Sequence, residues 1–422
     1  MMPIFSRQIH IRFSILLVSI LLISCKQSRS AYSDSDTSRY REIHESLFTI
    51  DTHTDTPMNF VGDTFDMSKA HDPYATGSRL DLPRMKKGGL DAVFLAVFIG
   101  QGPRTPEGNE QARQEALKIF SAIDTMLYRN TQLAALALNP GDAEKIVKTG
   151  KRALFIGLEN GYPIGNDIHM VEKFYQLGAR YITLCHTRNN DICDSSNDTT
   201  NFNGLSRFGE DVVCEMNRLG MLIDVSHVSD SSFFDVLRIS RTPVIASHSS
   251  SRAVCDNPRN LTDSMLLALA KNGGVAQVCL LSDYVKPHTA FPERDSARAS
   301  VRKKFGDYYK LDEETQKRFR AEWREIDRVY PPKLATVADL CDHIDHMVAV
   351  AGIDHVGIGS DFDGGGGLAD CFDVSQFPLI TKELMHRGYN HEQLEKIWGG
   401  NFLRVFNDVI AAAGKNKISR QN

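Results

Sequence analysis

The stretch Ala153-Leu154-Phe155-Ile156-Gly157-Leu158, followed directly by Glu159, carries the pattern on which the fold prediction depends. Its residues form a near-continuous apolar run, which is typical of a parallel β-strand that is buried on both faces. The run ends at a carboxylate, Glu159. The stretch is therefore predicted to be a buried strand with a polar side chain at its carboxyl end.

Runs of the same kind recur along the chain, each rich in β-branched residues and bounded by turn or polar residues. They cover Phe48–Asp51, Ala92–Phe98, Tyr181–Cys185, Met221–Val225, Pro243–Ser247, Gly274–Leu281 and His355–Gly359. Stretches with helical spacing of apolar residues lie between them. These are Pro106–Asn130, Ile168–Leu177, Gly209–Leu219, Asp230–Ile239, Thr262–Lys271 and Thr336–Ala351.

Alternating strands and helices imply a parallel sheet, and eight such units predict an α/β fold, a closed (β/α)8 barrel of the TIM type. The alternative is a doubly wound open sheet. No Gly-x-Gly-x-x-Gly follows the first strand, which removes the commonest argument for that alternative.

One segment interrupts the alternation before the last strand. Residues 282–335 are dense in charge, for example at Arg302-Lys303-Lys304, and are predicted to form an exposed helical insertion in the barrel. A lid over the site is the less supported interpretation. Helices over Ser375–Arg387 and His391–Ala413 are predicted to close the chain.

The composition excludes several classes of protein. With 42% hydrophobic and 24% charged residues, the 422-residue chain is neither disordered nor fibrous. Its 49 Lys and Arg residues are outnumbered by 53 Asp and Glu residues, so the net charge is −4. Nothing in this balance favours a nucleic-acid partner.

The N-terminus has the features of an export signal. Arg7 and Arg12 flank a short polar start, and an apolar run over Phe13–Ile23 follows that is too short to span a bilayer. It ends in Leu22-Ile23-Ser24-Cys25, which looks like the lipid-attachment motif of bacterial lipoproteins. An ordinary cleaved signal with a chance cysteine is the alternative.

These features predict a lipoprotein of the bacterial cell envelope that faces the periplasm or the exterior and is held in the membrane through lipidated Cys25. The predicted division is a signal peptide over 1–24, a tether over 25–42, a barrel over 43–414 with the insertion over 282–335, and a tail over 415–422. The other seven cysteines are scattered without a Cys-x-x-Cys motif, and an odd number cannot all pair, so at least one free thiol is expected.

Polar residues stand at the carboxyl ends of most predicted strands, and in a parallel barrel all these ends open on one face. Any one of them alone is more often a structural residue than a ligand, but their recurrence predicts a metal site. They are His53, Asp55, Glu159, His186, His227, His248 and Asp361. Imidazoles with carboxylates and no thiolate suit Zn, Mn or Fe. Two of the acids and three of the histidines are candidate ligands, with Asp361 and a further histidine beside them. These five ligands exceed the need of one catalytic zinc, which favours two metals bridged by a carboxylate.

The ordered set of motifs resembles the renal (membrane) dipeptidase family from about residue 44 to residue 412. The matching segments are Ile50-Asp51-Thr52-His53-Thr54-Asp55, Gly157-Leu158-Glu159, Tyr181-Ile182-Thr183-Leu184-Cys185-His186, Leu222-Ile223-Asp224-Val225-Ser226-His227-Val228-Ser229, Pro243-Val244-Ile245-Ala246-Ser247-His248-Ser249-Ser250 and Gly357-Ile358-Gly359-Ser360-Asp361-Phe362-Asp363-Gly364. The resemblance implies a dizinc dipeptidase that hydrolyses the peptide bond of small dipeptides with a metal-bridging hydroxide, and it also implies a homodimer.

The resemblance assigns a role to each matching residue. His53 and Asp55 would bind one zinc ion, His227 and His248 would bind the other, and Glu159 would bridge both. Three further residues would act on the substrate. In this assignment His186 contacts the substrate and the developing oxyanion, Arg259 holds the substrate carboxylate, and Asp361 handles the proton.

Two alternatives remain open at this point. The first is another amidohydrolase-type barrel that acts on cyclic amides, β-lactams or phosphoesters, although such enzymes typically begin with His-x-His and often bridge their metals through a carbamylated lysine. The second is a catalytically dead lipoprotein that binds metal or peptide. The preferred side chains and stereochemistry of the substrate are not predicted.

Overall fold

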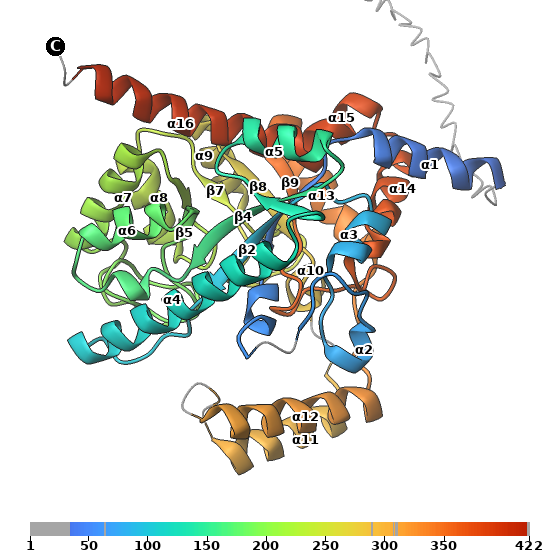
Figure 1. Ribbon diagram of the computed structural model, residues 1–422, viewed down its shortest axis with the longest axis horizontal. Coiled ribbons are helices and arrows are strands. Elements are labelled where there is room, and N and C mark those ends of the chain that lie inside the picture. The colour runs from blue at the N-terminus through green and yellow to red at the C-terminus, as the bar shows by residue number, and fades with distance from the viewer. Residues whose placement is uncertain (1–33, 63–64, 288–289, 307, 309–310, 420–422) are drawn as a thin grey trace, which may run out of the picture.

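The computed structural model describes residues 34–419, except for residues 63–64, 288–289, 307 and 309–310. Eight parallel strands form a nearly closed barrel with helices around it, in the order β1-β2-β4-β5-β6-β7-β8-β9 (Figure 1). The gap between the first and last strands is closed by a parallel bridge between Thr54 and Phe362 and by a 2.8 Å hydrogen bond from the Asp55 N–H to the Phe362 carbonyl. The predicted TIM-type barrel is therefore confirmed.

The strands agree with the apolar runs to within a few residues. Their bounds are β1 Ile50–Thr54, β2 Ala92–Phe98, β3 Ala134–Leu136, β4 Arg152–Glu159, β5 Ala179–Thr183, β6 Leu222–Asp224, β7 Ile245–Ala246, β8 Val275–Cys279 and β9 Val356–Gly359. The short strand β3 is not among the predicted strands. It pairs with β4 outside the barrel order.

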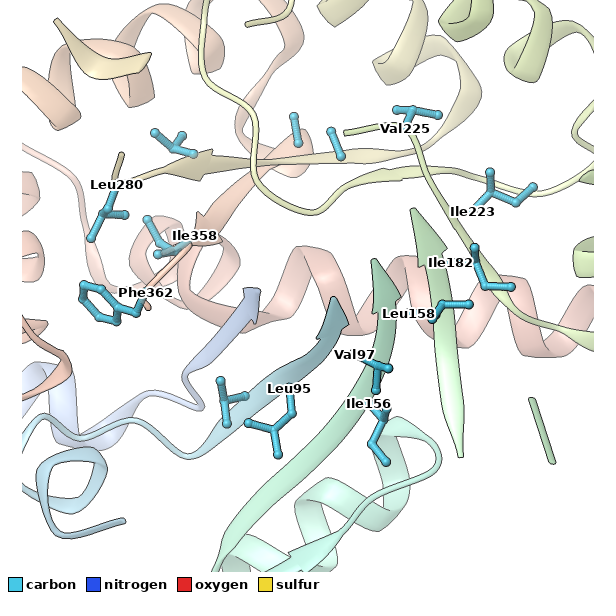
Figure 2. Packing of buried hydrophobic residues seen from close by; sticks show 14 of the residues in the cluster. Leu95, Val97, Ile156, Leu158, Ile182, Ile223, Val225, Leu280, Ile358 and Phe362 are labelled. Atoms are coloured by element: carbon cyan, nitrogen blue, oxygen red, sulfur yellow. The ribbon is translucent and has the colours of Figure 1, made fainter. Parts of the chain in front are cut away.

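The two faces of each strand pack into different layers, because successive side chains point to opposite sides. On β4, Leu154, Ile156 and Leu158 belong to the outer core between barrel and helices. Figure 2 shows Ile156 and Leu158 of β4 beside Leu95 and Val97 of β2. The alternate residues of β4 point into the barrel, and this register makes Glu159 the last inward-facing residue of its strand.

The helix α16 (Asn401–Ser419) closes the amino-terminal end of the barrel (Figure 1). Its residues Phe402, Val405, Phe406 and Val409 pack in one cluster with Phe94 and other inward-facing residues of the strands. This end of the barrel is thereby filled with apolar side chains. The carboxyl ends of the strands form the opposite end, where the polar residues identified in the sequence lie.

The remaining helices surround the sheet or belong to its connections. Most begin at a Ser, Thr, Asp or Asn side chain that accepts a hydrogen bond from the first turn, as Thr105 does from the Gly108 N–H of α4. Their bounds are α1 Asp34–Ser46, α2 Pro73–Thr76, α3 Leu82–Lys87, α4 Pro106–Arg129, α5 Pro140–Lys148, α6 His169–Gln176, α7 Arg207–Leu219, α8 Asp230–Ile239, α9 Asp263–Asn272, α13 Val337–Ala351, α14 Pro378–His386 and α15 His391–Glu395.

The insertion between β8 and the helix before β9 is helical, as predicted. It contains α10 (Ser282–Val285), α11 (Pro292–Phe305) and α12 (Glu313–Val329). Figure 1 shows α11 and α12 as a pair set apart from the helices that surround the barrel. Asp327 of α12 accepts hydrogen bonds from Arg294 at 3.0 Å and Arg298 at 2.8 Å, which ties the pair together.

Two predicted boundaries differ from the structure. Residues 34–42 belong to the predicted tether, but they form the first part of α1, where Tyr40 is buried. The predicted tail begins at residue 415, but α16 continues to Ser419. The signal peptide over 1–24 and Cys25 lie outside the described residues. The seven cysteines in the described part are all free thiols.

None of the helices in the described part of the chain is both long enough and apolar enough to span a bilayer.

Candidate active site

The strand ends bring six polar side chains together inside the barrel mouth. His53 lies within β1, and Glu159 is the last residue of β4. The others follow the ends of β5, β6, β7 and β9 by two or three residues, at His186, His227, His248 and Asp361. All except His186 are buried, so their polar atoms face one another rather than bulk water.

Glu159 stands at the centre of the four histidines. Its Oε2 atom is 3.3 Å from His53 Nε2. Its Oε1 atom faces the other three imidazoles, at 3.0 Å from His227 Nε2, 3.6 Å from His248 Nε2 and 3.8 Å from His186 Nε2. The two oxygens of one carboxylate therefore face two different sets of ligand atoms.

Two further carboxylates lie on the His53 side of the centre. Asp55 Oδ2 is 3.7 Å from His53 Nε2, and ligand atoms of His53, Asp55 and Asp361 all lie within 4.8 Å of one another. The backbone at Gly364 lies against both acids, since a Cβ atom there would be 1.9 Å from Asp55 Oδ2 and 2.3 Å from Asp361 Oδ1. Only a residue without a side chain fits so close to the two carboxylates.

The donor atoms fit divalent cations. The buried atoms His53 Nε2 and Asp55 Oδ1 have no hydrogen-bond partner among the described residues, a costly arrangement unless an ion satisfies them. The structure offers two more groups of ligand atoms within 4.8 Å of one another, one made by His53, Glu159 and His248 and one by Glu159, His186 and His227. Imidazole nitrogens and carboxylate oxygens without thiolates are a donor set for Zn, Mn or Fe.

Burial shifts the pKa of three of the four histidines and of Asp361. Burial lowers the pKa of His227 and His248 well below the usual range, and the positive charge of Arg259 adds to this effect. The pKa of His186 falls to about 3 because of burial. These imidazoles are therefore neutral near pH 7, which is the form that binds a metal. Burial and the adjacent Asp55 raise the pKa of Asp361 well above its usual range.

The backbone is strained at two of these positions. His227 has φ of 70° and Asp361 has φ of 59°, both in the left-handed region that L-residues rarely adopt. Such strain persists only where the surrounding structure imposes it, and it is common at functional sites. In both cases the unusual turn directly follows a strand and directs the side chain to the barrel mouth.

Arg259 lies at the edge of the centre, in the loop after β7. Its side chain is buried, and it donates to the His248 carbonyl at 3.0 Å and to Ser249 Oγ at 3.2 Å. Its guanidinium lies 5.2 Å from the centroid of the Tyr284 ring, and its Nε–H has no partner among the described residues. A buried guanidinium with an unused donor is suited to bind an anionic group.

Three residues of the site were not singled out from the sequence. The Tyr181 hydroxyl lies 2.8 Å from His53 Nδ1, and Gly157 leaves room for its ring, since a Cβ there would be 2.1 Å from Cζ. Ser247 Oγ lies 2.8 Å from His248 Nδ1 and donates to Asp224. The sequence could have indicated Asp224 as a site residue, because it is a carboxylate in the last inward-facing position of an apolar strand.

The sequence profile of the membrane dipeptidase family (peptidase family M19) matches residues 37–420. Dipeptidase verJ of Clonostachys rogersoniana is 32% identical over 407 residues, which are 92% of this chain and 91% of the relative. Dipeptidase 3 of Rattus norvegicus is 32% identical over 340 residues, which are 79% of this chain but only 59% of the relative.

Solved structures show the same fold. The probable dipeptidase PvdM from Pseudomonas aeruginosa superposes with a TM-score of 0.77 at 30% sequence identity, over 90% of this chain and all of that chain. The profile match and the relative matched over nearly its full length agree with the motifs that converge on Glu159. The chain therefore belongs to the membrane dipeptidase family, peptidase family M19, a family of hydrolases.

Proposed function

We propose that this protein is a metal-dependent dipeptidase that hydrolyses the peptide bond of small dipeptides, with two divalent ions, zinc by preference. The observation that carries the proposal is the position of Glu159. One of its oxygens faces His53, and the other faces His227 and His248. A carboxylate between two sets of ligands is the arrangement that a pair of bridged ions requires.

In this proposal His53 and Asp55 hold one ion, and His227 and His248 hold the other. Bound ions of this kind polarise the scissile carbonyl and activate the attacking water at neutral pH. His227 Nε2 lies 2.9 Å from His248 Nε2, which supports the proposal that both imidazoles bind the same ion. His53 Nε2 and Asp55 Oδ1, which have no hydrogen-bond partner, support the other half of the centre.

His186 and Asp361 act on the substrate. His186 is the histidine of the centre that is not fully buried, with 17% of its side chain exposed, so it can reach a bound dipeptide. From that position it stabilises the charge that develops on the carbonyl oxygen. Asp361 lies on the His53 side of the centre and moves the proton from the attacking water to the leaving amine.

Arg259 limits the length of the substrate. Its planar guanidinium offers a bidentate partner for a carboxylate close to the metal ligands, since it is hydrogen-bonded to the carbonyl of His248. In this proposal the carboxylate bound by Arg259 is the C-terminus of the residue that follows the reacting bond. The free C-terminus of a dipeptide meets this requirement.

The test is amino-acid release from a mixed dipeptide panel by the metal-free protein and by the protein reloaded with zinc. We expect hydrolysis only after metal is restored. Panels of cyclic amides, β-lactams and phosphoesters serve as controls for the alternative amidohydrolase chemistry. Hydrolysis of one of these in place of dipeptides would overturn the substrate assignment, and metal binding with no hydrolysis of any substrate would support a dead binding protein.

We also propose that the protein is attached to a bacterial envelope membrane through a lipid on Cys25. The support is the order of the first 25 residues, in which positive charge, apolar run and cysteine follow one another. In a Cys25→Ala variant the protein is expected in the soluble envelope fraction instead of the membrane fraction. An unchanged distribution would contradict the anchor.

A further inference from the structure

A buried chain of hydrogen bonds leads away from the metal centre through His248. His248 Nδ1 lies 2.8 Å from Ser247 Oγ, and Ser247 Oγ lies 2.6 Å from Asp224 Oδ2. All three residues are at most 1% exposed. The chain ends at Asp224, the last residue of β6, on the side of the imidazole opposite to Glu159.

The direction of these bonds follows from the surroundings of Asp224. Its Oδ1 accepts from two backbone N–H groups, those of Ser226 at 3.0 Å and Ser247 at 2.8 Å. Its Oδ2 accepts from the Thr183 hydroxyl at 2.5 Å and from the Ser247 hydroxyl. Three of these donors are independent of the Ser247 hydroxyl, and a carboxylate placed among them acts as an acceptor, so the Ser247 proton points to Asp224.

The state of His248 follows in turn. The Ser247 hydroxyl donates its only proton to Asp224, so toward His248 its oxygen can only accept a hydrogen bond. The His248 imidazole must therefore carry a proton on Nδ1. The lone pair is then on Nε2. That atom lies 3.6 Å from Glu159 Oε1 and 2.9 Å from His227 Nε2, inside the metal centre.

We infer that Asp224 and Ser247 are positioning residues that hold His248 in the tautomer able to bind a metal through Nε2. The inference rests on the proposed function in one respect, since it takes His248 as a metal ligand. Partners of this kind orient the ring and increase its basicity, and their loss typically weakens metal binding about 10- to 100-fold.

A purely structural role for Asp224 is the competing explanation. β6 and β7 share one pair of residues in their ladder, Asp224 with Ile245, and the Asp224 carboxylate reinforces this short contact through the Ser247 N–H. A variant at Asp224 can therefore lower stability for reasons unrelated to His248. Variants of Ser247 distinguish the two explanations, because its hydroxyl links the Asp224 carboxylate to the His248 imidazole.

The test uses four variants of the full chain and two readouts. Ser247→Ala removes the link, Ser247→Thr keeps a hydroxyl, and Asp224→Asn places an amide donor where Ser247 needs an acceptor. Thr183→Val is the matched control, because it removes another donor to the same Asp224 oxygen without touching His248. The readouts are Zn²⁺ affinity by chelator competition and the imidazole ¹⁵N resonances of the metal-free protein.

We expect Ser247→Ala and Asp224→Asn to lose about 10- to 100-fold in affinity for one of the zinc ions. Ser247→Thr should recover most of the loss, and Thr183→Val should change only thermal stability. In the metal-free wild type the His248 resonances should show a protonated Nδ1, and this signature should be lost in Ser247→Ala.

Three results would overturn the inference. They are a wild-type His248 protonated on Nε2, a Ser247→Ala variant with wild-type zinc affinity, or an equal loss of affinity in Thr183→Val. A wild-type protein that binds no zinc would instead contradict the proposed function, and the resonances of the metal-free protein would still decide the tautomer.

Discussion

Glu159 and Asp361 are buried carboxylates of the same centre, but their neighbours differ. Glu159 is surrounded by imidazoles on both of its oxygens. Asp361 instead lies near Asp55, and its Oδ2 accepts a 3.9 Å contact from the Cys279 thiol. The first environment suits a ligand that two ions share. The second keeps a carboxyl group close to the reacting water without making it the centre of the ligand set.

The first prediction concerns this division of roles. Asp361→Asn keeps the shape of the side chain but removes its ability to take and return a proton. We expect kcat for dipeptide hydrolysis to fall by about 10²- to 10⁴-fold while metal content stays at the wild-type level. Metal analysis on the same sample is the control. Full activity in this variant would exclude the proton-transfer role.

The second prediction concerns Arg259. Arg259→Lys keeps the charge but loses the planar pair of donors. The specificity constant kcat/KM for dipeptides with a free carboxylate should fall by about 10- to 100-fold, mainly through KM. The corresponding dipeptide amides are the control, because they lack the anion and should be affected much less. An equal loss for both substrates would contradict the proposed contact.

Helix α1 shows how tertiary contacts override the pattern of the local sequence. Its sequence is polar, and the tether prediction therefore failed over residues 34–42. The structure docks it through His44, whose ring nitrogens bind the Thr381 hydroxyl of α14 at 2.7 Å and the Gly88 carbonyl at 2.9 Å. Trp398 packs against the same ring at 4.7 Å. The sequence around His44 gives no indication of contact partners that are so distant along the chain.

The third prediction follows from this docking. Burial lowers the pKa of His44 to about 4 from an unfolded value of 6.5. A depressed pKa means that the neutral form stabilises the fold above pH 6.5, and that this contribution, roughly 3 kcal/mol, is lost as the pH falls from 6.5 to 4. Urea unfolding of His44→Asn should show a flatter pH dependence than the wild type in this range. Identical slopes would contradict the assignment.

The strand β3 gives a second case at this scale. Its residues Ala134–Leu136 carry no β-branched or aromatic side chain, so propensity does not predict a strand. The structure makes it one by parallel pairing with Arg152–Leu154 of β4. Strands of the barrel itself were predictable, because burial on both faces leaves a continuous apolar run in the sequence.

The barrel has two chemically different ends. The carboxyl ends of the strands hold the polar centre, and α16 fills the other end with apolar side chains. The sequence predicted the polar end well, because histidines and carboxylates stand where apolar runs stop. It did not predict the partners Tyr181, Ser247 and Asp224, because their roles depend on which strands are neighbours in the closed barrel.

The fourth prediction is that a cavity at the apolar end of the barrel lowers stability without changing metal binding at the other end. Phe406 of α16 is fully buried, with ring centroids 5.7 Å from Phe155 and 6.1 Å from Phe402. Phe406→Ala should lower the free energy of unfolding by about 3–5 kcal/mol, measured by denaturant unfolding, because it leaves a cavity. The number of bound metal ions should not change. Loss of metal without loss of stability would contradict the separation of core and site.

We propose that Glu159 and the residues around it hold two metal ions and that the protein in this form hydrolyses dipeptides. The most direct measurement is a titration of the metal-free protein with Zn²⁺ while dipeptide hydrolysis is followed. We expect activity to rise with added metal and to reach its plateau at two equivalents per chain. A plateau at about one equivalent, or no hydrolysis when two ions are bound, would contradict it.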